Sequence, residues 1–115
     1  MVNVNGRKGA LFETAVMKWL RLQGMLVERL TKAGAKDEGD LVVIVAGQSY
    51  ILELKNRARL DLPTFWSEAL IEANNYAKAR SLDATPPSYV VVKRRNAGID
   101  QSWVIQSLEQ WTRTR

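Results

Sequence analysis

The chain has 115 residues, which is enough for one domain and too few for a second independent core. It has no cysteine and no histidine, which excludes disulfides, thiolate and imidazole metal sites, and histidine-dependent catalytic triads. With 17 Lys plus Arg against 12 Asp plus Glu, its net charge is +5, and nucleic acid is a candidate partner. Enzymatic chemistry would have to use carboxylates, lysine or hydroxyls. Hard cations such as Mg²⁺ stay open because they prefer oxygen ligands.

The chain carries no long apolar segment. Its longest apolar run, residues 41–46, is far too short to span a bilayer. The first residues are polar, with Arg7 and Lys8, and are not followed by the apolar core of a signal peptide. We therefore expect an intracellular protein, cytoplasmic or nucleoid-associated, with no membrane partner.

Apolar periodicity predicts the elements in chain order. Phe12, Val16 and Leu20 recur at helical spacing, and Gly24 offers a stop after them. Pro63 suits the first turn of a second helix, whose expected apolar face is Trp66, Ala69, Leu70, Ala73 and Ala77. The predicted helices are residues 10–23, a helix that begins near 63, and residues 107–112. The predicted strands are residues 26–30, 40–45, 50–55, 88–93 and 101–106.

This order, α-β-β-β-α-β-β-α, is typical of an α/β domain with a central mixed sheet of about five strands flanked by helices. One domain is expected to occupy residues 1–115.

The strand at residues 50–55 carries the first chemical signal. Side chains alternate along a strand, so Glu53 and Lys55 share one face. The alternative for this pair is a weak ion pair on a solvated face, worth roughly 0–1 kcal/mol. With a turn centred near Gly47–Gln48, Asp40 is expected opposite Lys55 and diagonal to Glu53. Two carboxylates so close repel each other unless a cation intervenes, and a divalent metal would resolve this.

The pattern of Gly39-Asp40, twelve intervening residues and then Glu53-Leu54-Lys55 resembles the core motif of the PD-(D/E)xK nuclease superfamily, which has the restriction-endonuclease-like fold. That superfamily often places a Glu on its first helix, where this chain has Glu13. The order of elements over about residues 7–80 is most similar to the archaeal-type Holliday junction resolvases. Gly39 stands where the superfamily frequently has Pro.

The resemblance implies a role for each of these residues. Asp40 and Glu53 would bind Mg²⁺, which Mn²⁺ is expected to replace, and the backbone carbonyl of Leu54 would complete the inner ligands. Glu13 would reach the same ion directly or through water. Lys55 would orient the attacking water and stabilise charge on the phosphate. The alternative for Glu13 is an ordinary exposed glutamate favoured by the helix dipole.

Basic residues flank these positions in the sequence. DNA phosphates are expected to contact Arg7, Lys8, Lys32, Lys36, Arg57 and Arg59. The alternative for any one of them is a solubilising charge. A second basic group, Lys93, Arg94 and Arg95, is expected to contact a more distant DNA arm.

Other side chains are expected to be structural. Glu68 and Glu72 are interpreted as solvated helix positions. Trp19 and Trp66 are expected in the core. Trp103 and Trp111 are expected either in the core or at a dimer interface, where Trp is enriched. A four-way junction has near two-fold symmetry, so a resolvase would be a C₂ homodimer with two active sites.

The leading hypothesis is a Mg²⁺-dependent endodeoxyribonuclease of DNA recombination and repair that cleaves branched DNA, namely a Holliday junction resolvase. A second hypothesis keeps the same site in a flap, single-strand or restriction-type nuclease. A third is a nucleic-acid-binding module without catalysis on a nuclease-like fold.

Overall fold

A computed structural model describes residues 4–30 and 40–114, and for residues 4–6 and Asp40 it describes the backbone only. Within these ranges the elements are α1 (Val4–Leu22), β1 (Leu26–Arg29), β2 (Asp40–Val45), β3 (Gln48–Lys55), α2 (Leu62–Ala79), β4 (Ser88–Val92), the 3₁₀ helix η1 (Ile99–Gln101), β5 (Trp103–Ile105) and α3 (Leu108–Thr114). The α/β class and the expected order of helices and strands are confirmed.

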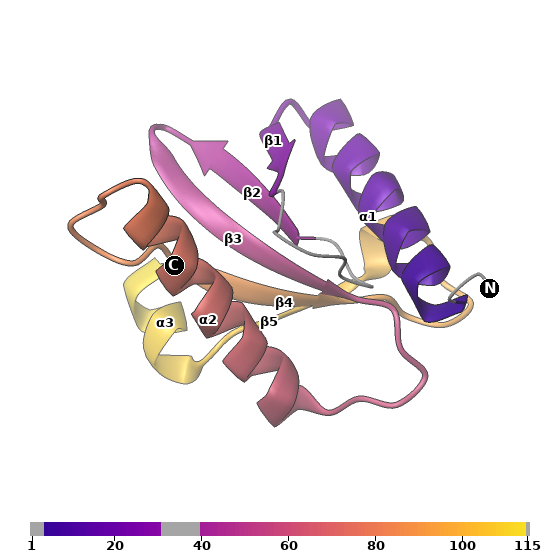
Figure 1. Ribbon diagram of the computed structural model, residues 1–115. Coiled ribbons are helices and arrows are strands. Elements are labelled where there is room, and N and C mark those ends of the chain that lie inside the picture. The colour runs from indigo at the N-terminus through magenta and orange to yellow at the C-terminus, as the bar shows by residue number, and fades with distance from the viewer. Residues whose placement is uncertain (1–3, 31–39, 115) are drawn as a thin grey trace.

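The strands form one mixed sheet in the order β1-β2-β3-β4-β5. The β3–β4 pair is parallel and the other three pairs are antiparallel. The parallel pair is joined by a crossover through α2, as parallel neighbours require. Figure 1 shows α1 and α2 on either side of the sheet.

Each sheet face is closed by one helix, because alternate strand residues point to opposite faces. On the α1 face, Phe12 and Val16 pack in a cluster with Val27, Leu41, Val43, Leu54 and Val91. On the α2 face, two clusters contain Phe65, Ala69, Ala73 and Tyr76 with Val42, Ile51, Val90 and Val92. Glu53 and Lys55 therefore belong to the α2 face of β3. None of the helices among the described residues is long and apolar enough to cross a membrane.

The β2–β3 turn differs from the expectation. Ala46 and Gly47 form a two-residue turn with φ of 50° and 81°, the left-handed geometry that matches the twist of antiparallel strands. The turn centre lies one residue earlier than expected, so every partner shifts by two residues. Asp40 is opposite Glu53 instead of Lys55.

Helix boundaries and some tryptophan positions also differ. α1 begins at Val4 instead of residue 10, while Gly24, at φ 88°, confirms the expected stop. Trp19 is exposed, so its assignment to the core is wrong. The buried residues of α2 include Phe65 and Tyr76, and Trp66 is half-buried against that core.

Trp103 and Trp111 are also exposed, so the core interpretation is wrong for both. Trp103 lies on the edge strand β5, and the buried residue of α3 is the neighbouring Gln110.

Gln110 fastens α3 to the sheet. Its side chain is buried, and its Nε2 donates to the carbonyl of Ser88 at 2.6 Å. Its Oε1 accepts from the Ser88 backbone N–H at 3.2 Å. The Ser88 hydroxyl in turn donates to the carbonyl of Ala69 in α2, at 3.1 Å. Buried polar groups at the start of β4 thus connect α2, β4 and α3.

Gln110→Ala should lower the free energy of unfolding by about 1–3 kcal/mol, because it leaves the buried Ser88 amide and carbonyl without their partner. Urea denaturation followed by circular dichroism measures the change. The control is Glu109→Ala on the same helix, whose exposed pair with Arg113 should be worth less than about 1 kcal/mol. Equal effects of the two substitutions would contradict the assigned role of Gln110.

Candidate acidic site at one end of the sheet

Four strands bring their chemically interesting residues to the same end of the sheet. β3 and β4 are parallel and end there, with Lys55 opposite Val92. β2 and β5 begin there, with Asp40 opposite Glu53 and Trp103 opposite Val92. In Figure 1 this end lies at the arrowhead of β3, beside the N-terminal part of α1. Residues distant in the sequence are thereby gathered in one region.

Glu53 and Lys55 form a buried ion pair. Each side chain is only 3% exposed, and Lys55 Nζ lies 3.3 Å from Glu53 Oε1. The interpretation of this pair as a solvated surface pair is therefore wrong. Asp40 and Glu53 occupy directly opposite positions of the ladder, so both positions belong to the face covered by α2. This is closer than the diagonal relation that the sequence predicts.

Glu68 of α2 is part of the same group. Its Oε1 lies 3.1 Å from Lys55 Nζ, and its side chain is 47% exposed. Glu68 is exposed, as the sequence predicts, and its carboxylate also reaches a buried ammonium. Phe65, three residues earlier, places its ring centre 5.0 Å from Lys55 Nζ. Phe65 and Glu68 are three residues apart, so they lie side by side on one surface of the helix, and this spacing is the sequence feature that points to Glu68.

Burial of the charged side chains of Glu53 and Lys55 carries a large desolvation cost. An ion pair taken out of water loses hydration that its mutual attraction often fails to restore, and a hydrophobic replacement is frequently as stable or more stable. Glu53 and Lys55 share this cost at the end of a strand that otherwise buries Ile51 and Leu54. A role in stability alone is a weak explanation for them. Strongly desolvated charges of opposite sign are instead typical of functional sites.

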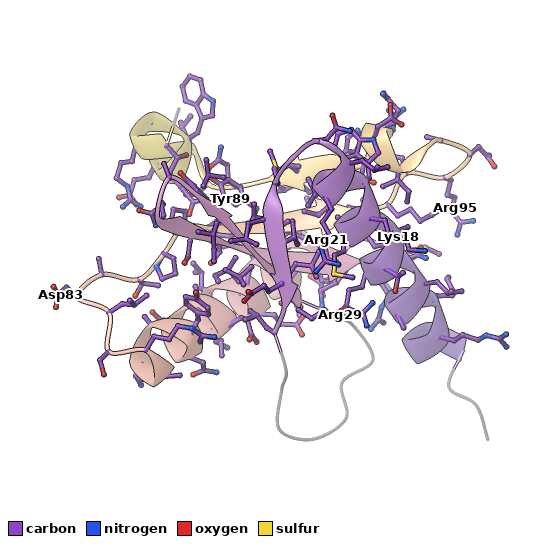
Figure 2. All side chains as sticks on the ribbon, turned by 90° about the horizontal axis from the view of Figure 1, so that it is seen from above. Lys18, Arg21, Arg29, Asp83, Tyr89 and Arg95 are labelled. Carbon is purple, nitrogen blue, oxygen red and sulfur yellow. The ribbon has the colours of Figure 1, made fainter. Side chains whose placement is uncertain are left out.

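Glu13 lies on α1, against the opposite face of the sheet. It is 9% exposed, and its Oε1 forms an ion pair with Arg29 Nε at 2.7 Å. Arg29 Nη2 also donates to the hydroxyl of Thr14 at 2.6 Å, and Figure 2 shows Arg29 between β1 and α1. The alternative of an ordinary exposed helix glutamate is therefore wrong. Sequence reasoning did not identify Arg29, because only the fold brings β1 beside α1.

Oxygen donors at this end of the sheet suit a hard cation, but few of the acidic side chains there are described. Among residues whose side chains are described, no three acidic side chains gather in a metal-sized cluster. The pair of positions that would hold an ion is Asp40 and Glu53, together with the backbone of Leu54, whose side chain is buried on the α1 face. The participation of these residues and Glu13 in metal binding stays a prediction.

Several basic residues lie on the segments that adjoin this end of the sheet in the sequence. Of the predicted DNA-binding residues, Arg7 and Arg59 are exposed and Lys8 and Arg57 are half-buried, while Lys32 and Lys36 lie outside the described residues. The segment that follows β4 adds Lys93, Arg94 and Arg95.

Lys93 belongs to the same end of the sheet as Lys55, because its backbone N–H donates to the carbonyl of Lys55 at 3.1 Å. Its neighbour Arg94 stacks over the ring of Trp103. The segment that begins at Lys93 therefore leaves the sheet at the same end as Lys55, because β4 is parallel to β3. The contact of Lys93, Arg94 and Arg95 with a more distant DNA arm stays a prediction.

Arg29→Met should lower the free energy of unfolding by about 1–3 kcal/mol, because the buried Glu13 carboxylate loses a charged partner. The same substitution in a Glu13→Gln background should cost less, and denaturant unfolding of the four proteins gives the coupling. Arg59→Met, at an exposed position, is the control and should change stability by less than about 0.5 kcal/mol. Additive effects of the Arg29 and Glu13 substitutions would contradict the pairing.

Comparison of the chain with protein-family models, with curated proteins and with solved structures gave no significant match. The chemistry of the residues at this end of the sheet therefore carries the functional interpretation.

Proposed function

We propose that this chain is a Mg²⁺-dependent endodeoxyribonuclease with a restriction-endonuclease-like fold, acting on branched DNA as a Holliday junction resolvase. The observation that carries the proposal is the placement of Asp40 directly opposite Glu53, with the Lys55 ammonium buried beside Glu53. The sequence motif that resembles the PD-(D/E)xK superfamily thus coincides with a real juxtaposition in the ladder.

The donor chemistry fits Mg²⁺ or Mn²⁺. Carboxylates and a backbone carbonyl are the hard oxygen ligands that these ions prefer, and the chain offers no histidine or cysteine. Asp40, Glu53 and the Leu54 carbonyl would hold the ion. Glu13, on the other face of the sheet, would act through water around the sheet end. A bound divalent ion supplies positive charge to a phosphodiester and acidifies a water molecule.

The remaining groups act on the substrate. Lys55 is held in place by packing and by charged partners, so its N–H groups can orient a water molecule and stabilise negative charge that grows on the phosphate. Arg57 and Lys93 follow the ends of β3 and β4, where basic side chains would contact phosphates without reading the base sequence. Binding should therefore weaken steeply with salt.

Cleavage of a four-way junction requires two nicks, and we propose a C₂ homodimer to supply them. An exposed apolar surface supports this part of the proposal. It lies on β5 and α3 and consists of Trp103, Val104, Leu108 and Trp111. Several large exposed apolar side chains on two consecutive elements of a small domain are typical of an association surface.

Asp40→Asn and Glu53→Gln should each reduce Mg²⁺-dependent cleavage by at least about 100-fold while junction binding persists, because each removes a charge that would hold the ion. The assay compares a four-way junction, a flap, a single strand and a linear duplex of matched sequence. Paired symmetric nicks in the junction alone are expected for a resolvase.

Asp83→Asn, in the exposed loop after α2 on the far side of the molecule from Arg95 (Figure 2), removes the same charge and should leave cleavage unchanged. Cleavage retained in either site variant would refute the site. Preferential cleavage of flaps or single strands would assign the same site to another nuclease type, and lack of all metal binding would favour a binding module.

The solution mass measured by sedimentation equilibrium should be about twice the 13.0 kDa of one chain. Leu108→Arg should reduce it to that of a monomer, because it replaces one of the exposed apolar side chains of this surface with a charge. Leu22→Arg is the matched control, since Leu22 is an equally exposed leucine of α1, outside that surface, and should remain dimeric. A wild-type chain that stays monomeric at high micromolar concentration would contradict the homodimer.

A further inference from the structure

We propose that Glu68 is a positioning residue that holds the Lys55 ammonium and keeps it from neutralising Glu53. This inference rests on the proposed function, and it assigns a role to a residue outside the nuclease motif. It concerns how the site keeps a lysine and a metal-binding carboxylate adjacent without letting the two cancel each other.

The ammonium of Lys55 is shared between two carboxylates. Its Nζ lies 3.3 Å from Glu53 Oε1 and 3.1 Å from Glu68 Oε1, and only the Glu68 contact approaches from the helix. A lysine that rested on Glu53 alone would compete with a cation for the charge of that carboxylate. A second carboxylate within the same reach divides the attraction, because the Coulomb energy depends on each separation.

The two carboxylates have different environments. Glu53 is 3% exposed and Glu68 is 47% exposed. Glu68 can therefore keep part of its hydration while it binds the ammonium, so its desolvation cost is lower than that of Glu53. It is suited to accept the full interaction with Lys55 when the charge of Glu53 is directed to a cation.

The packing of α2 fixes this geometry. Ala69 and Ala73 are completely buried, and their small side chains let the helix approach the sheet closely. The hydroxyl of Ser88 at the start of β4 donates to the carbonyl of Ala69 at 3.1 Å, which fastens the helix one residue after Glu68. Phe65 adds a ring 5.0 Å from Lys55 Nζ. Lys55 is thereby confined by the aromatic face as well as by the carboxylates.

The test is a double-mutant cycle of Glu68→Gln and Lys55→Met, read by calorimetric titration with Mn²⁺. Glu68→Gln alone should weaken Mn²⁺ binding by about five- to tenfold, because Lys55 then rests on Glu53. Lys55→Met should tighten Mn²⁺ binding, and adding Glu68→Gln to it should have little further effect. A fivefold or larger loss in the Lys55→Met background would overturn the proposal, because Glu68 would then act on the ion itself.

Cleavage kinetics on the preferred substrate give a second measurement. Glu68→Gln should lower kcat by about 10- to 100-fold with little change in KM, as expected for a displaced catalytic group. Asp83→Asn loses the same charge at an exposed position and should alter neither Mn²⁺ binding nor kcat. Thermal unfolding of each variant checks that the fold is retained. An unchanged kcat in Glu68→Gln would overturn the positioning role.

The two proposals fail in different ways. A chain that binds Mn²⁺ and shows the Glu68–Lys55 coupling but cleaves no DNA would refute the nuclease function and leave the positioning of Lys55 intact. A chain that cleaves DNA with Mn²⁺ and shows additive effects of the two substitutions would refute the role of Glu68 alone.

Discussion

The register of the β2–β3 hairpin is the constraint on which the candidate site depends. Ala46 and Gly47 adopt positive φ in a two-residue turn, and that turn places Asp40 opposite Glu53 at the far end of the ladder. A slip of one residue would transfer the Asp40 position to the face covered by α1. The buried residues Leu41 and Val43 on one face and Val42 on the other hold this register, so the hydrophobic core determines which acidic positions meet.

The parallel pairing of β3 with β4 is the second determinant. It makes both strands end on the same side, so the segments that begin at Asn56 and at Lys93 leave the sheet together. A short antiparallel connection would have sent them to opposite ends. The crossover also lays α2 over the same end and thereby brings Glu68 to Lys55. One topological feature thus supplies both the basic surroundings and the partner of the buried lysine.

Local patterns predicted much of this arrangement, but they could not predict contacts between elements. Strand alternation was sufficient to place Glu53 and Lys55 on one face, and the turn composition indicated a hairpin. The register was wrong by two residues because an Ala-Gly turn and a Gly-Gln turn look alike until their φ angles are known. Arg29 and Glu68 find their partners 16 and 13 residues away along the chain, through packing that no local pattern encodes.

The buried polar groups divide the molecule into two ends with different chemistry. At the start of β4, Ser88 and Gln110 are neutral and satisfy each other with two hydrogen bonds, which attach α3 without burying a charge. At the other end, Glu53 and Lys55 are charged and equally buried, although neutral or apolar residues would be less costly there. If stability alone governed this site, it should resemble the Ser88–Gln110 end. The charged pair lies at the end where the segments after β3 and β4 leave the sheet, and the metal binding and chemistry that we propose there would account for its cost.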